Sequence, residues 1–212
     1  ELGVTRELDV RPVPLGADYP VVTPRPVADA AHLGRFVLVV GTLEPRKNQQ
    51  VVLDAFERLQ SDHPDLALVL VGKEGWLVDR LVQRLRRHPR RDKELHWLGR
   101  VDDRKLAWLY DNAFVTVAPS IYEGLGVPVL EALGHGCATI ASTGGAQPEA
   151  AGDAAELFEP TDGAALTSLL RRHIEDPSHH ERQRAAAAAF PCPTWAATSQ
   201  EIAAHLAELV TV

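Results

Sequence analysis

Two positively charged side chains, Arg46 and Lys47, stand together in residues 41–48, between an apolar run and a segment with helical spacing. The first N–H groups of a helix lack partners within the helix and attract anions, and arginine and lysine bind phosphate through charge-assisted hydrogen bonds. This loop therefore suits an anionic ligand such as a diphosphate. A solvated surface pair would show the same residues, and the phosphate-binding pattern Gly-x-x-x-x-Gly-Lys-Ser/Thr is absent.

A second loop, residues 119–126, carries two glycines, Gly124 and Gly126, between an apolar run and the start of another helical pattern. Glycine allows backbone N–H groups to approach a phosphate closely. The string superficially resembles a dinucleotide-binding fingerprint. However, Val129 stands where the third glycine is required and the loop follows a late strand, so NAD binding is disfavoured.

Two carboxylates, Glu123 in this loop and Glu131 in the helix predicted after it, are eight residues apart. If the span were all helical they would be roughly 12 Å apart along the axis, too far to form one acid–base pair. The spacing suits contacts to two hydroxyl-bearing groups on either side of a bound diphosphate, which is the layout of a sugar nucleotide. The alternative is that Glu131 faces solvent on its helix and Glu123 is an ordinary loop carboxylate.

Apolar runs that alternate with helical patterns predict the elements that hold these loops. Strands are expected at 36–40, 66–71, 95–98, 114–118, 138–142 and 157–158, and helices at 51–59, 77–85, 106–110, 127–133, 164–174, 182–189 and 195–209. Asn48 is a candidate N-cap for the first helix. Buried strands in alternation with helices predict an α/β fold with a doubly wound, Rossmann-like parallel sheet, which binds ligands at the carboxyl ends of its strands.

The composition excludes several other classes of protein. The chain has 212 residues, 45% of them hydrophobic and 24% charged, as in ordinary globular chains rather than disordered or fibrous ones. A net charge of −7 argues against a nucleic-acid partner, and no apolar stretch is long enough to span a membrane. Cys137 and Cys192 form neither a disulfide scaffold nor a metal-ligand spacing, which favours a cytoplasmic location. A start at Glu1 without methionine indicates a fragment or processed chain.

The residues that carry this chemistry resemble a known family. Glu123 and Glu131, with seven residues between them, resemble the E-x7-E signature of retaining glycosyltransferases of the GT-B fold, family GT4. Residues 41–48 resemble the subgroup with Gly-Thr-x-x-Pro-Arg-Lys-Asn, and the similarity extends from about Val10 to the C-terminus. The resemblance implies the C-terminal, donor-binding half of a GT-B protein. Residues 1–35 would be the interdomain linker and 36–212 the Rossmann-like domain with C-terminal helices.

The resemblance also implies roles for residues in the two loops. Arg46 and Lys47 would bind the donor phosphates and Glu123 would position the donor sugar, which makes these three the catalytic set. Backbone N–H groups for the phosphates would come from Gly124, Leu125, Gly126 and Val127.

Further roles concern the nucleoside part of the donor. Glu131 would hold the ribose hydroxyls, Arg100 and Val101 would contact the base through the main chain, and Asp103 would read a guanine edge. Thr42 is also expected among the substrate-binding residues, although much of the family has arginine there, for which Arg46 would substitute.

The expected function is hexosyl transfer, with mannose as the favoured sugar, from a GDP- or UDP-sugar to a glycan or lipid-linked acceptor. No metal and no other cofactor are expected, and any contact with the inner face of the membrane would be peripheral and through the acceptor. The acceptor domain would be the missing N-terminal half, so the isolated chain is expected to be inactive. Alternatives are a nucleotide-sugar-binding module without catalysis and a GT-B epimerase or synthase-type enzyme.

The histidines are not expected to form a site. His135, His173, His179 and His180 show no constellation of metal ligands in the sequence, so surface or structural roles are predicted for them.

Overall fold

The computed structural model describes residues 10–18, 22–28 and 32–210, so parts of the predicted linker 1–35 lie outside the described residues. The described residues between 22 and 191 form one compact unit. Residues 10–18 form a second unit together with the described residues from 192 onward.

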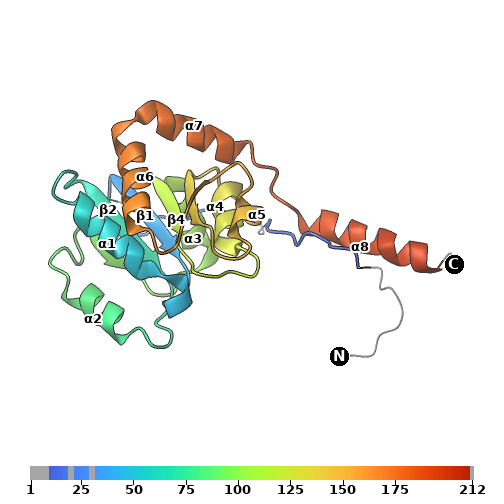
Figure 1. Cartoon of the computed structure of the whole chain (residues 1–212), viewed down its shortest axis with the longest axis horizontal. Helices are drawn as coiled ribbons and strands as arrows, with labels where there is room; N and C mark the ends of the chain where they lie inside the picture. Colours follow the sequence, from blue (N-terminus) through green and yellow to red (C-terminus); the bar gives the residue numbers. More distant parts are fainter. Residues whose placement is uncertain (1–9, 19–21, 29–31, 211–212) are drawn as a thin grey trace. The chain divides into compact units, whose positions relative to one another are not determined.

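The larger unit is built on a six-stranded parallel sheet with the strand order β3-β2-β1-β4-β5-β6. This is the order of the Rossmann doubly wound sheet, as the sequence predicted. Apolar residues fill the central strands because both faces of the sheet are covered by helices (Figure 1). The strands are β1 (Arg35–Val40), β2 (Leu66–Val71), β3 (Leu95–Trp97), β4 (Val115–Ala118), β5 (Thr139–Ser142) and β6 (Glu156–Phe158).

Helices connect successive strands, and two more helices of this unit follow the last strand. They are the short 3-10 helix η1 (Pro45–Lys47), α1 (Gln49–Leu59), α2 (Asp79–Arg87), α3 (Asp103–Asn112), α4 (Val127–Gly134), α5 (Gln147–Ala151), α6 (Gly163–Glu175) and α7 (Pro177–Ala188). The predicted strands and the long helices are confirmed, with end shifts of a few residues. The sequence analysis missed η1 and α5, because three and five residues are too few to show a helical period.

Alternate side chains of β1 enter two separate cores, one on each face of the sheet. Val37 and Val39 pack with buried residues of α1, α2 and α6. Phe36 and Leu38 pack with buried residues of α3 and α4. The two-residue period of a strand thus explains why the run from 36 to 40 is apolar throughout.

The smaller unit pairs helix α8 (Trp195–Val210) with the described residues 10–18. Ala17 donates its backbone N–H to the carbonyl of Pro193 at 2.8 Å, and the hydroxyl of Thr198 donates to the carbonyl of Pro14 at 2.7 Å. A Cβ on Gly16 would lie 2.3 Å from the backbone nitrogen of Trp195, so glycine is required for this close approach.

Candidate functional site

The loops that follow β1 and β4 meet at one edge of the sheet. β1 and β4 are neighbours, and the strand order runs outward from them in opposite directions, so the loops lie where doubly wound sheets bind ligands. The backbone N–H of Ile121 donates to the carbonyl of Arg46 at 2.7 Å. Asn48 is the N-cap residue of α1, as predicted, but its side chain makes no capping hydrogen bond. Its Nδ2 donates instead to the carbonyls of Pro119 at 3.1 Å and Pro160 at 2.8 Å. These bonds tie the two loops together.

Glu123 lies at the centre of this junction and is bound by side chains from both loops. Lys47 pairs with one of its carboxylate oxygens, and Nη1 of Arg46 lies 3.2 Å from the other. The hydroxyl of Ser120 donates to Oε1 at 2.7 Å. Nε of Arg46 also lies 3.0 Å from a carboxylate oxygen of Glu44. The structure thus joins the three residues predicted as the catalytic set in one network.

This network controls the charge of Glu123, which is only 8% exposed. Burial favours the neutral acid, but hydrogen bonds from Lys47 and Ser120 and the positive charges of Lys47 and Arg46 outweigh it and lower the pKa of Glu123. The side chain of Lys47 is 13% exposed and that of Arg46 is 47% exposed. An anionic ligand could therefore reach Arg46 first, and it would compete with Glu123 for both cations.

Residues that follow β5 hold the backbone around Glu123 in place through hydrogen bonds. The backbone N–H of Ala146 donates to the carbonyl of Glu123 at 2.8 Å, and Nε2 of Gln147 donates to the carbonyl of Ser120 at 3.2 Å. A Cβ on Gly145 would lie 2.3 Å from the carbonyl oxygen of Glu123. The sequence analysis did not assign Ser120 or Gln147 to the site, because each is a common polar residue whose partner lies on another element.

The glycine-rich stretch lies at the start of α4, as predicted. Gly126 precedes the helix in the left-handed region at φ 77°, and Val127 is the first helical residue. Gly124 is exposed, Leu125 is half-buried and Gly126 is buried. The free N–H groups at the start of a helix are suited to an anion in this position.

Glu131 lies in α4 and is held by a residue that the sequence analysis did not single out. The hydroxyl of Tyr110, which is buried in α3, donates to Oε2 of Glu131 at 2.6 Å. The ring of His135 stacks on Tyr110 with centroids 5.2 Å apart, and its Nδ1 lies 2.7 Å from a carboxylate oxygen of Asp111. His135 therefore has a structural role, as predicted, and Glu131 is an oriented carboxylate rather than a free one.

The remaining predicted residues lie farther along the same edge of the sheet. Thr42 follows β1, and its carbonyl accepts a hydrogen bond from Nε2 of Gln49 at 2.9 Å. Arg100 and Val101 follow β3, and Asp103 is the first residue of α3; Arg100 and Asp103 are exposed. Among the described residues, Arg100, Val101 and Asp103 are observed in no contact with the ion-paired network of Glu123.

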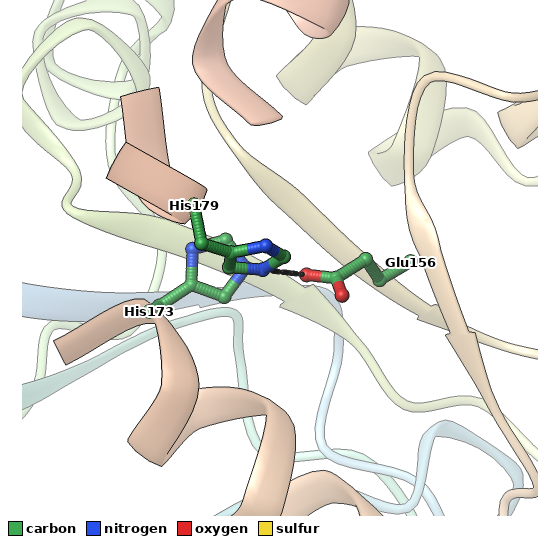
Figure 2. A group of neighbouring side chains, drawn as sticks. All are labelled: Glu156, His173 and His179. Carbon is green, nitrogen blue, oxygen red and sulfur yellow. Dashed lines mark hydrogen bonds and ion pairs between the residues drawn. The ribbon is translucent and has the colours of Figure 1, made fainter. Parts of the chain in front are cut away.

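A second cluster, outside these loops, brings together Glu156, His173 and His179 (Figure 2). The Nε2 atoms of His173 and His179 lie 2.8 Å and 2.9 Å from the same oxygen of Glu156. The sequence analysis found no ligand constellation around these histidines. The structure shows that His173 and His179 are buried and share one partner, Glu156, which lies on a different element, 17 residues before His173.

Comparisons with known proteins find a matching family model and several similar proteins. Residues 26–190 match the family model described as Glycosyl transferases group 1. The chain is 36% identical over 147 residues to O-antigen chain mannosyltransferase B of Escherichia coli, and 32% identical over 173 residues to the glycogen synthase of Mycobacterium tuberculosis. These matches cover 69% and 81% of this chain but only 38% and 40% of the relatives. The chain thus spans about two fifths of each relative's length.

A solved structure shares the fold. The C-terminal domain of a glycosyl transferase group 1 family protein from Francisella tularensis superimposes with a TM-score of 0.65 at 21% identity, and the match covers 79% of this chain and 86% of that one. No helix among the described residues has the length and apolar character needed to cross a membrane.

Proposed function

The chain belongs to the family Glycosyl transferases group 1, and from this premise we propose that it binds the donor of a retaining hexosyl transfer, a nucleoside diphosphate sugar. The observation that carries the proposal is the meeting of two loops at the switch point of the sheet. There Arg46 and Lys47 of the first loop pair with Glu123 of the second, four residues before α4 begins at Val127. Two cations and a helix N-terminus fit a diphosphate, and carboxylates on either side fit hydroxyl groups.

The donor would lie across this edge of the sheet. Its diphosphate would contact Arg46, Lys47 and the N–H groups of residues 124–127, and its ribose would contact Glu131. Binding of the phosphates to the cations would release Glu123 from its ion pairs, so its carboxylate could accept hydrogen bonds from the donor sugar. In this way Glu123 would exchange its ion pairs for hydrogen bonds to the sugar.

The sugar is proposed to be a hexose, with mannose favoured because the Escherichia coli relative at 36% identity is a mannosyltransferase by name. Asp103 stands exposed at the start of α3, where its carboxylate could accept from the N–H groups of guanine. A GDP-sugar is therefore the first candidate and a UDP-sugar the second. The acceptor would be a glycan or a lipid-linked sugar held by a separate acceptor-binding domain.

The cations would act mainly on the leaving group. As the bond between the anomeric carbon and the diphosphate breaks, negative charge grows on the diphosphate, and Arg46, Lys47 and the α4 N-terminus would stabilise it electrostatically. The acceptor hydroxyl would attack from the face that the diphosphate leaves and would pass its proton to the departing diphosphate oxygen, which retains the configuration at the anomeric carbon. Glu123 would position the sugar in this step and would not act as a base.

The test is calorimetric titration of the chain with GDP, UDP, GDP-mannose and UDP-glucose, followed by the same titrations on Arg46→Ala and Lys47→Ala. Loss of a charge-assisted contact costs about 1.5–3 kcal/mol, which is roughly 10- to 150-fold in Kd. We expect this loss for each variant with the best diphosphate ligand, and almost none for the corresponding nucleoside. Lys93→Ala, an exposed lysine just before β3, is the matched control and should bind as the wild type does.

Two results would contradict the proposal. One is the absence of saturable binding of every nucleotide by the wild-type chain. The other is an unchanged diphosphate affinity in both loop variants, which would remove the phosphate role of the two cations.

A further inference from the structure

Three side chains from three elements converge at the corner between α6 and α7. Glu156 is the first residue of β6, His173 lies in the last turn of α6 and His179 lies in the first turn of α7. Figure 2 shows both imidazole rings directed at the carboxylate of Glu156. One potential ligand atom from each residue can be chosen so that all three lie within 4.8 Å of one another.

The cluster is buried, and one of its atoms has no hydrogen-bond partner. The side chains of His173, His179 and Glu156 are 0%, 4% and 15% exposed. Nε2 of His179 makes a hydrogen bond of 2.9 Å to Oε2 of Glu156. Nε2 of His173 lies 2.8 Å from the same oxygen, but its N–H direction does not fit, and it makes no hydrogen bond to any described residue. A buried polar atom left in this way is costly.

A bound metal ion would give the buried Nε2 of His173 a partner. Each imidazole would offer the lone pair of Nε2 instead of an N–H, and the carboxylate would offer an oxygen, so one cation would satisfy all three groups. Two histidine nitrogens and one carboxylate oxygen are a ligand set used by zinc, and imidazole favours zinc-class transition metals over magnesium or calcium.

The ring of His173 is also held from its other side. Its Nδ1 lies 3.0 Å from Nδ1 of His180, and the His180 ring stacks on Phe114 with centroids 4.1 Å apart. Histidines that bind metals commonly donate their second ring N–H to a neighbouring acceptor, which fixes the tautomer and the ring orientation. His180 is placed to accept that bond.

We propose that Glu156, His173 and His179 bind a divalent transition-metal ion of the zinc class, which fastens the α6–α7 corner to β6. The role is structural, because Glu156 begins its strand whereas the candidate donor loops follow the ends of theirs. The ion is therefore separate from the chemistry proposed for Glu123. This inference does not depend on the proposed function.

The experiment uses the untagged full chain, stripped with a chelator and then titrated with Zn²⁺, with Mg²⁺ as the hard-cation comparison. We expect one Zn²⁺ per chain and no saturable effect of Mg²⁺. At free Zn²⁺ 100-fold above Kd, the unfolding midpoint should rise by about 5–10 °C for a chain of this size. Glu156→Gln and His179→Gln should each weaken Zn²⁺ binding by at least about tenfold. His88→Gln changes another histidine paired with a glutamate, with a side chain only 7% exposed, and should not weaken Zn²⁺ binding.

A second measurement keeps the proposal testable if the cluster variants fold poorly. In the wild-type chain labelled with ¹⁵N, Zn²⁺ should shift the Nε2 resonances of His173 and His179 and leave those of His88 unchanged. Unchanged resonances at saturating Zn²⁺ would overturn the proposal. Equal Zn²⁺ affinity in wild type and in folded Glu156→Gln would overturn it as well, since the cluster would then be a histidine–carboxylate hydrogen-bond network only.

Discussion

At the scale of single residues, the candidate donor site is defined by the ion pairs of Glu123 with Lys47 and Arg46. Lys47 and Arg46 already have an anionic partner, so a diphosphate replaces a carboxylate rather than entering an unpaired cationic pocket. Breaking these pairs costs part of the binding free energy, and it is offset only if Glu123 finds new partners. Donor sugar hydroxyls would supply such partners, which favours the complete donor over its diphosphate fragment.

The two carboxylates should therefore have separable effects on binding. Glu131→Gln should weaken even the sugar-free nucleotide, because a ribose contact is lost, and Tyr110→Phe should do so more mildly, because the hydroxyl that orients Glu131 at 2.6 Å is removed. Glu123→Gln should leave sugar-free diphosphate affinity unchanged or stronger and weaken only the sugar nucleotide. Calorimetry with both ligands checks this, and equal losses of sugar-free affinity in the two Gln variants would refute the assignment.

The stability contributed by Glu123 should depend on pH. Its pKa is lowered in the folded protein, despite burial, by Lys47, Ser120 and Arg46, so its contribution is fully present above the unfolded value near 4.5 and is lost as pH falls through the folded value. Urea unfolding of wild type and Glu123→Gln should show the largest difference in free energy at pH 7 and a shrinking one below about pH 4.5. A difference that stays constant from pH 7 to pH 3.5 would contradict this.

At the scale of elements, the site depends on close approach between the loops that follow β4 and β5. Gly144 and Gly145 lie against the backbone of residues 120–123, where a Cβ would come within 2.4 Å and 2.3 Å of carbonyl oxygens. Glycine is therefore required for space at both positions, and at Gly145 also for its backbone conformation at φ 64°. The loop after β5 thus sets the position of Glu123.

Gly145→Ala should thus be more destabilising than a glycine substitution matched in backbone strain. Gly145 and Gly99 have φ values of 64° and 62°, but a Cβ on Gly99 meets nothing within 4 Å. Strain alone should cost about 1–2 kcal/mol in both variants. The clash with Glu123 should add about 1–3 kcal/mol in Gly145→Ala alone. Urea unfolding of the two variants measures the difference in their free energy of unfolding. Equal losses of stability would show that the loops can move apart at little cost.

At the scale of the whole molecule, the two clusters lie at different places on the sheet and should respond to different ligands. The donor loops follow the ends of β1 and β4, whereas Glu156 begins β6. Arg46 and Lys47 supply the positive charge that a diphosphate needs, so donor binding in excess chelator should match binding with added Mg²⁺ or Mn²⁺. Calorimetry under the three conditions checks this, and a loss of more than tenfold in chelator, about 1.4 kcal/mol, would overturn it.

The sequence by itself determined the element types and the edge of the sheet where the candidate site lies. Apolar runs such as 36–40 indicate strands buried on both faces, and helical patterns between them require parallel strands, whose carboxyl ends share one edge. Arg46, Lys47 and residues 123–127 follow such strand ends, so their common location could be inferred. These signals are local, since the side-chain periods of a strand and of a helix repeat within a few consecutive residues.

Tertiary structure alone decided which of these side chains touch. Pairing of β4 with β1 brings Glu123 against Lys47, which lies 76 residues earlier. The packing of α6 against β6 and of α7 against α6 and β5 brings His173 and His179 to Glu156. Such contacts depend on the strand order and on how helices pack, which are set by the summed burial of many residues. No short sequence pattern around Glu123 or His173 identifies the residue that it contacts, because that contact depends on the tertiary structure as a whole.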